Sequence, residues 1–323
     1  QGDDRFRICG DNFSRDVYFL TPWPKMLALG GLLETVAVAA TGEGRRAVFE
    51  RAGADTDKEI VYNVALVPDP DVAPSPLLPF VRLRTTQRRP MTRRPLTPAQ
   101  KSALEAAASP FRVLWLDDRA RQKALAHLAS RYAKIRLTIP EAFEVHRKVI
   151  EWDARYSNDR IPDQAIGLDE PTLKLMHWAM KSWKRVDFMN RYLAGTLMPR
   201  LQLELKPGLN AAGYVSLLAP EPLRSIDDFV AAGRAMQRFW LTLTRLGLQF
   251  QPQMAPLIFD SYVRKEIGFT AKRDALTAAK ELSPRLAAVL GPGNHAFLGR
   301  IGVGAAPRAR SLRRPLSDFL PKS

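Results

Sequence analysis

The sequence predicts an α+β fold with a mixed or antiparallel central sheet flanked by helices. Apolar residues at helical spacing predict several long helices, of which residues 225–246 are the clearest. Short apolar runs at residues 111–118 and 213–219 predict buried strands. These elements alternate without the regular strand–helix–strand period of a doubly wound parallel sheet, so the α+β class is favoured.

A first unit is expected to end in a proline-rich stretch, PDPDVAPSPLLPF, because no regular element tolerates so many prolines. Before this stretch the patterns predict a strand at residues 4–11 and a helix at 25–41 that packs closely through Gly30 and Gly31. Two further strands are predicted at residues 46–52 and 60–67. The domain boundaries are therefore placed at residues 1–80 and 81–323.

The second unit opens with a helix at residues 97–108, where Thr97 is the expected N-cap and Pro98 suits the first helical position. A segment interrupted by Gly195, Pro199 and Pro207 is expected to be a lid or covering segment. The remaining helices are expected at residues 118–134, 140–153, 170–190, 225–246, 256–266 and 271–290, with a last strand at 295–306. The aromatic side chains Trp178, Trp183 and Phe188 are expected to pack in the core.

Composition limits the possible functions. The single cysteine, Cys9, excludes a disulfide within the chain and a cysteine-based zinc site, and it fits a cytoplasmic location. The four histidines are scattered, so no metal site is predicted. No apolar run approaches the ~20 residues of a membrane span, and no membrane partner is predicted. The net charge of +16, from 49 basic and 33 acidic residues, favours an anionic partner.

Two arginine-rich stretches are the strongest functional signal. The first, QRRPMTRRPLTPAQ at residues 87–100, directly precedes a predicted helix N-terminus, where backbone amides and the helix dipole favour an anion. The second, RIGVGAAPRARSLRRPLSDF at residues 300–319, follows the last strand. Guanidinium groups bind phosphate oxygens in a bidentate way. The alternatives are a solvated basic turn and a disordered basic tail.

At these stretches the sequence resembles the nitroreductase-like flavoprotein superfamily. The turn RRPMTRRPL is similar to the RRxTNRRPF of the long, internally paired branch, whose members are sometimes fused to adenylyltransferase-like domains. Three further stretches match in family order: EVHRKVIEWDARYSNDRIP (144–162), AAGRAMQRFWLTLTRLGLQFQP (231–252) and the RIG…P…RR pattern of the second arginine stretch.

The resemblance implies a nitroreductase-like fold, pseudo-dimeric within one chain or assembled as a homodimer. It implies an FMN-dependent oxidoreductase with NAD(P)H as reductant and a small-molecule substrate. By this resemblance, the first arginine turn and the C-terminal arginines hold the FMN phosphate, and a backbone amide after the long helix faces flavin N5. The cofactor-binding residues so implied are Arg88, Arg89, Thr92, Arg93, Gly247, Leu248, Arg313 and Arg314.

The sequence departs from the family pattern at two places. Met91 stands where the family has a hydroxyl residue, so Thr92 is expected to replace it. No segment like the ring-contacting PSxxNxQPW occurs. These departures support an alternative, a degenerate and non-catalytic relative that sequesters flavin or acts as a partner protein. A nucleic-acid binder is a second alternative that rests on charge alone, because no reading module is recognisable. No catalytic residue and no substrate are predicted.

Overall fold

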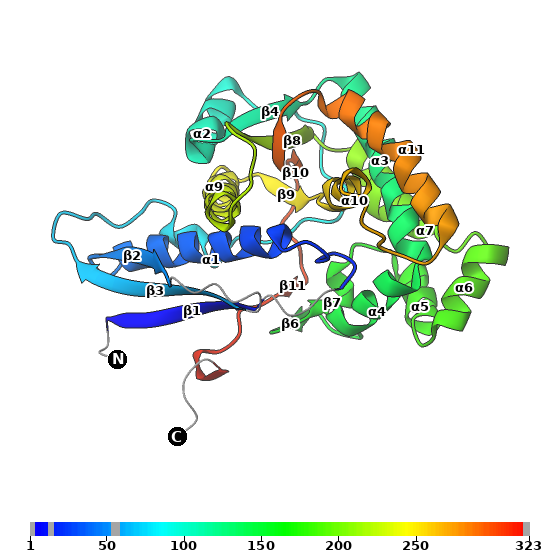
Figure 1. The fold of residues 1–323 in the computed structure, drawn as a ribbon, viewed down its shortest axis with the longest axis horizontal. Coiled ribbons are helices and arrows are strands. Elements are labelled where there is room, and N and C mark those ends of the chain that lie inside the picture. The colour runs from blue at the N-terminus through cyan, green and yellow to red at the C-terminus, as the bar shows by residue number, and fades with distance from the viewer. Residues whose placement is uncertain (1–3, 12–15, 53–58, 319–323) are drawn as a thin grey trace.

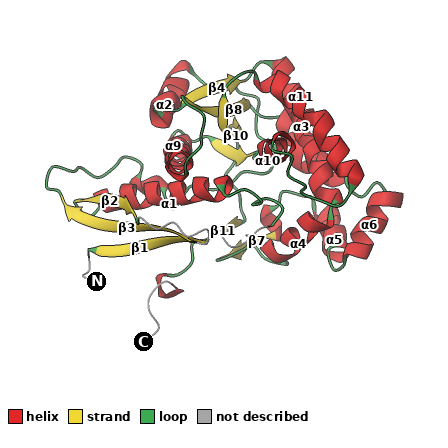
Figure 2. Ribbon diagram, in the orientation of Figure 1, coloured by secondary structure: helices red, strands yellow, loops and turns green. Residues whose placement is uncertain are grey.

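The computed structural model describes residues 4–11, 16–52 and 59–318, and it confirms the α+β class. The central sheet has the order β4-β8-β10-β9, and each neighbouring pair is antiparallel (Figures 1 and 2). Its strands are β4 Arg112–Leu116, β8 Gly213–Ala219, β9 Gln249–Pro252 and β10 Asn294–Gly302. Every residue of β8 is buried, as the continuous apolar run GYVSLLA predicts.

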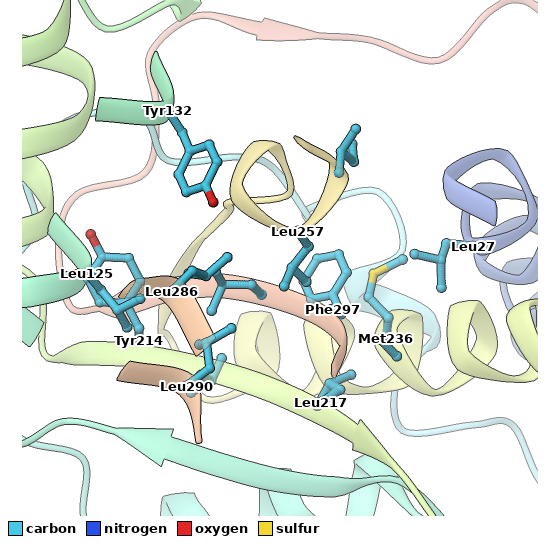
Figure 3. Close-up of a cluster of buried hydrophobic side chains, with 14 of the residues drawn as sticks. Leu27, Leu125, Tyr132, Tyr214, Leu217, Met236, Leu257, Leu286, Leu290 and Phe297 are labelled. Carbon is cyan, nitrogen blue, oxygen red and sulfur yellow. The ribbon is translucent and has the colours of Figure 1, made fainter. Parts of the chain in front are cut away.

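Helices cover both faces of this sheet (Figure 1). The helices α2 and α9 lie on one side, and α3, α10 and α11 lie on the other. Leu217, Phe297 and Leu286 come from β8, β10 and α11 and meet in one hydrophobic cluster between these layers (Figure 3). The bounds of these helices are α2 Pro98–Ala108, α3 Arg119–Thr138, α9 Ile226–Arg245, α10 Ala255–Arg264 and α11 Arg273–Leu290.

The N-terminal unit has its own antiparallel sheet, with the strand order β1-β3-β2. Its elements are β1 Arg5–Asp11, α1 Trp23–Thr41, β2 Arg45–Arg51 and β3 Glu59–Pro68, which confirms the expected strands and helix. Residues 53–58, which connect the last two strands, lie outside the described residues. Helix α1 packs along α9 so closely that a Cβ at Gly30 would overlap the carbonyl oxygen of Val230. The domain boundary near residue 80 stays a prediction.

Two expected helices differ from the structure. The helix expected over 170–190 is two helices, α5 Glu170–Ala179 and α6 Trp183–Tyr192, because the hydroxyl of Ser182 caps a new helix start. The helix expected over 140–153 ends earlier, as α4 Pro140–Val149, and the chain continues as β5 Ile150–Glu151, which pairs with β7 Ile161–Pro162.

The expectation that all three aromatic residues of this segment lie in the core is wrong for two of them. Trp183 is half-buried against Phe143, with ring centroids 5.6 Å apart. Trp178 and Phe188 are 46% and 52% exposed. Helices α5 and α6 lie at the edge of the molecule, at the opposite end from the β1–β3–β2 sheet (Figure 1), and nothing among the described residues packs on their outer faces.

The covering segment breaks around Gly195 and is helical from Leu197 to Leu209 in spite of its prolines. It consists of α7 Leu197–Arg200, a π-helical turn η3 Leu201–Leu205 and α8 Lys206–Leu209. Pro207 lies inside this continuous helical stretch, and the carbonyl oxygen of Leu203, four residues earlier, accepts from Arg300 Nη1. This segment packs along α3 and helps to close a large cavity described below.

The C-terminal segment packs on the protein surface as far as Arg313. Its strand β11 Arg310–Ser311 pairs in parallel with β6 Tyr156–Ser157. Arg313 Nη2 donates to the Val81 carbonyl oxygen at 3.3 Å, so the disordered-tail alternative does not hold for this part of the segment. The short turns η1 Leu78–Phe80, η2 Asp163–Ala165 and η4 Leu316–Asp318 complete the described elements.

Candidate cofactor site

A cavity of about 1120 Å³ lies where the N-terminal segment meets the second unit. Its walls come from segments that are far apart in the sequence, and most of its lining is apolar. The contributing segments are residues 18–24, the end of α3, α4, residues 158–166, α5, α6, residues 193–204, residues 251–258 and the C-terminal residues 311–312. A cavity of this size and polarity accommodates a cofactor with a flat apolar ring.

Three arginines from distant segments meet at this cavity: Arg88, Arg136 and Arg300. Arg300, on β10, is completely buried. Its Nη2 donates to the Arg88 carbonyl oxygen at 2.9 Å, and its Nη1 donates to the Leu203 carbonyl oxygen at 3.0 Å. Its Nε is buried and donates to no partner among the described residues. A buried donor without an acceptor is costly, and this cost makes Arg300 Nε the least satisfied atom of the arginine group.

Glu204 is the buried acid of this group. Its Oε1 accepts from Arg136 Nη2 at 2.9 Å. Its Oε2 lies 3.8 Å from Arg300 Nη1 and accepts no hydrogen bond from the described residues. The charged residues lining the cavity are four arginines and two carboxylates, which leaves a net charge of +2: Arg88, Arg136, Arg160 and Arg300 against Asp159 and Glu204. A phosphate dianion would neutralise this charge.

The crowding of positive charge affects the pKa of the arginines. Burial, followed by the charges of Arg300 and Arg136, lowers the pKa of Arg88 to about 10. Burial also lowers the pKa of Arg300, and the negative charge of Glu204 partly opposes this decrease. Burial acts to lower the pKa of Arg136, but Glu204 and Tyr18 outweigh it and raise that pKa. Arginine side chains stay cationic at neutral pH in proteins, and a bound anion would relieve the mutual repulsion of these three groups.

Tyr18 and His146 form a second polar feature of the cavity wall. The Tyr18 hydroxyl and His146 Nε2 lie 2.9 Å apart and share a hydrogen bond. Burial, assisted by the charge of Arg136, lowers the pKa of His146 to about 3, so its ring is neutral at physiological pH. Burial raises the pKa of Tyr18. The pair therefore holds an uncharged, proton-bearing hydroxyl at the wall of the cavity.

The segment that follows β9 forms another part of the wall. Gln251, Gln253 and Met254 line the cavity just before α10 begins. The side-chain oxygen of Gln251 is buried and accepts no hydrogen bond from the described residues. Like Arg300 Nε, it is an unpaired polar atom of a residue that lines the cavity, so a ligand with both donors and acceptors would satisfy both.

The structure places the predicted phosphate-binding residues of the first turn at different depths. Arg88 lines the cavity, and its Nη1 donates to the Ala165 carbonyl oxygen at 3.2 Å. Arg89 and Arg93 are exposed, and Arg93 Nε donates to the Leu209 carbonyl oxygen at 2.9 Å. Thr92 is also exposed, and its amide pairs with the Val303 carbonyl oxygen at 2.7 Å. Of this turn, only Arg88 lines the cavity.

Met91, which replaces the hydroxyl residue of the family pattern, is 5% exposed. A Cβ at Gly302 would lie 2.8 Å from the Met91 Cβ, so the turn packs directly against the end of β10. The methionine therefore contributes packing at this place.

The predicted C-terminal arginines belong to a different group. The charge of Arg313 acts on Arg84 together with that of Arg310, and burial with these two charges lowers the pKa of Arg84 to about 10. Arg84 stacks on the Trp240 ring at 4.1 Å. Arg314 Nε pairs with Asp318 Oδ2 at 3.1 Å. The structure thus groups Arg313 with Arg84 and Arg310, and it groups Arg88 with Arg300 and Arg136.

The two backbone amides that were predicted to face the flavin, those of Gly247 and Leu248, already donate to carbonyl oxygens at the end of α9. Gly247, in the left-handed region with φ +69°, donates to the Thr244 carbonyl oxygen at 3.1 Å. Leu248 donates to the Leu243 carbonyl oxygen at 2.9 Å, and its side chain lies in the core. Neither residue lines the cavity, whose nearest wall in this part of the chain begins at Gln251.

Sequence reasoning missed most of the polar residues of the cavity. Arg300 stands in the quoted RIG pattern, so the pattern could have indicated it. His146 likewise stands in the quoted stretch 144–162, whereas Tyr18, Arg136 and Glu204 carry no local signal, because only the folding of distant segments brings them together. Among the described residues, no group of three or more histidine, cysteine or acidic side chains could hold a metal ion, and no helix is long and apolar enough to cross a bilayer.

No protein-family profile matches the chain, and no curated protein matches it. Its structure is similar to a nitroreductase with bound FMN from Bacteroides fragilis, at 10% identity over 72% of this chain and 89% of that one, with a TM-score of 0.36. It is similar to the FMN-dependent nitroreductase NfnB from Mycobacterium smegmatis in complex with NADPH, at 17% identity over 76% and 96%, with a TM-score of 0.40. A third similar structure is a nitroreductase-like family protein from Bacillus cereus, at 13% identity over 77% and 96%, with a TM-score of 0.38. All three carry the name of the superfamily that the sequence motifs resemble.

Proposed function

We propose that the chain is an FMN-dependent oxidoreductase whose flavin lies in the 1120 Å³ cavity. The observation that carries this proposal is the buried arginine group at an otherwise apolar cavity. Its lining has a net charge of +2 and an unpaired guanidinium donor, Arg300 Nε. FMN combines the two properties that such a site requires, a dianionic phosphate and a flat, largely apolar ring.

In this proposal Arg88, Arg136 and Arg300 hold the phosphate, and the apolar residues of α4, α5 and the covering segment enclose the ring. Gln251, with its unpaired oxygen, accepts a hydrogen bond from a ring N–H. The roles of Arg89, Thr92, Arg93, Arg313 and Arg314 in phosphate binding, and those of Gly247 and Leu248 near N5, stay predictions.

When bound, FMN supplies hydride or electron transfer at N5, with NAD(P)H as the proposed reductant. The chain contributes orientation and electrostatics. The cationic arginines favour an anionic ligand, and the apolar wall excludes water from the ring. The Tyr18 hydroxyl, held by neutral His146, keeps a proton at the cavity wall. A small, largely apolar acceptor is the substrate class that this lining favours.

The proposal is tested by titrating the purified protein with FMN and with riboflavin, which lacks the phosphate, while following flavin fluorescence. Wild-type protein is expected to bind FMN at least tenfold more tightly than riboflavin, because charged hydrogen bonds to phosphate contribute about 1.5–3 kcal/mol each. Arg88→Gln should lose most of this preference and keep its affinity for riboflavin. Arg94→Gln is the matched control, since Arg94 is exposed in the same turn and does not line the cavity.

Equal affinity of the wild-type protein for the two flavins, or no uptake of either, would contradict the proposal. Circular dichroism of each variant shows whether it is folded. The alternative of a non-catalytic, flavin-sequestering relative is supported by Met91 in place of a hydroxyl residue. Consumption of NADPH with a quinone or a nitroaromatic acceptor would exclude that alternative, and tight FMN binding without any turnover would support it.

A further inference from the structure

The outer faces of α5, α6 and the segment after them carry a continuous set of exposed apolar side chains, which we call the α5–α6 patch. Six of its residues are between 45% and 70% exposed: Leu175, Trp178, Phe188, Tyr192, Leu193 and Met198. Exposed apolar surface of this extent on neighbouring helices is characteristic of an interaction site.

The patch is held together across the two helices. Phe188 and Tyr192 lie one helical turn apart on α6, and their ring centroids are 5.2 Å apart. The Arg185 guanidinium stacks on Trp178 of α5 at 4.7 Å and also donates to the Trp178 carbonyl oxygen at 3.0 Å. The aromatic rings of the two helices therefore belong to one surface.

Basic side chains surround these aromatic rings. Lys184 precedes Phe188 by four residues, so helical spacing places it beside that ring, and Lys174, four residues before Trp178, pairs with Glu170 at 2.6 Å. Residues 170–200 carry six lysines and arginines against two acids, which gives a net charge of +4. Aromatic and aliphatic side chains mixed with lysine and arginine are typical of helices that lie in the interface of a membrane with anionic lipids.

The patch is also the rim of the cavity. Leu175, Leu193 and Met198 line the cavity and are 50%, 61% and 45% exposed, so these three residues of the patch border both the solvent and the cavity. Contact of this face with a lipid surface would place the mouth of the cavity at the hydrocarbon boundary.

We propose that the α5–α6 patch docks the protein on the surface of a membrane that contains anionic lipids. Charge decides between this partner and a second copy of the chain, since a symmetric dimer through this face would bring together two copies of a segment with a net positive charge. The sequence predicts no membrane partner, because it contains no span. Peripheral docking needs no span, since it requires only an exposed amphipathic face. The proposal does not depend on flavin binding.

The test is co-sedimentation of the full chain with vesicles of phosphatidylcholine alone and with vesicles in which one quarter of the lipid is phosphatidylglycerol. At about 0.1 M salt we expect at least tenfold stronger partitioning to the anionic vesicles, decreasing as salt rises. Phe188→Ser/Tyr192→Ser should reduce binding at least tenfold. Leu32→Ser/Val48→Ser is the matched control, because these residues are 48% and 45% exposed on the N-terminal unit.

A charge-reversal pair separates specific docking from general attraction by the +16 chain. Lys184→Glu/Arg191→Glu should abolish the preference for anionic vesicles, whereas Lys280→Glu/Arg285→Glu, the same change on α11, should leave most of it. Equal loss in both pairs would overturn the proposal, and so would absence of vesicle binding. Size-exclusion chromatography gives the remaining outcome: a dimer that Phe188→Ser/Tyr192→Ser converts to a monomer would assign the patch to a second copy and overturn the proposal.

Discussion

Acidification below about pH 6.5 is expected to destabilise the protein through His146. Its Nε2 shares a 2.9 Å hydrogen bond with the Tyr18 hydroxyl, and burial with the charge of Arg136 lowers its pKa to about 3. In the unfolded chain a histidine has a pKa of about 6.5. Between these two values the unfolded state binds a proton that the folded state excludes, so the free energy of unfolding falls as pH falls.

The magnitude follows from the difference between the two pKa values. Each pH unit in this window changes the free energy of unfolding by about 1.4 kcal/mol per proton. From pH 6.5 to pH 5 the expected loss is therefore about 2 kcal/mol, and it levels off below about pH 3. The ring borders the cavity and is half-buried, so solvent in the cavity makes this figure the upper end of the range.

The assay is urea unfolding at pH 7, 6 and 5 for the wild-type chain and for His146→Gln, whose amide can still bond the Tyr18 hydroxyl. We expect the difference in stability between the two chains to change by up to about 2 kcal/mol across this range. Burial also lowers the pKa of His295, but this residue is present in both chains and cancels in the difference. Parallel stability curves for the two chains would refute the reasoning.

Three further predictions concern packing, charge and capping. Gly30→Ala should destabilise the protein by about 3 kcal/mol, because the new Cβ overlaps the Val230 carbonyl oxygen, whereas Gly31→Ala, with no neighbour of its Cβ closer than 3.6 Å, should be neutral or stabilising in thermal unfolding. Similar melting temperatures for the two variants would contradict the assigned α1–α9 contact. Glu204→Gln should cost about 3 kcal/mol in urea unfolding, because it leaves buried arginines without their acid, and an unchanged midpoint would show that the carboxylate is dispensable. Thr97→Ala should cost about 1 kcal/mol by removing a capping box at the start of α2, and thermal melting equal to that of wild type would show that the box contributes nothing.

Features that depend on neighbouring residues were predictable from the sequence. Thr97 and Ser225 each accept a hydrogen bond from an amide three residues on, so the cap signal and its partner lie in one short stretch. The buried strand β8 was predictable because its apolar run is continuous. Ser182 starts a new helix within a stretch of helical periodicity, and the pattern alone does not separate a break from a continuation.

The candidate site was only partly predictable. The first arginine turn does reach the cavity through Arg88, whose carbonyl oxygen accepts from Arg300, but Arg313 lies with Arg84 and Arg310 instead of with Arg88. Which arginine of the turn faces inward depends on how the turn packs: Met91 packs against Gly302, and Arg88 faces the cavity. Neither the packing of Met91 nor the inward position of Arg88 can be deduced from a turn that contains four similar arginines.

By itself the sequence determined the fold class, the order of most elements and the net positive charge of the chain. Each of these depends on composition or on the periodicity of residues that are close in the chain. The tertiary structure alone decided that Arg88, Arg136 and Arg300 share one buried group with Glu204, and that Trp178 and Phe188 face outward. The physical reason is that both depend on which surfaces pack together, and contacts between residues tens to hundreds of positions apart have no signature in a single sequence.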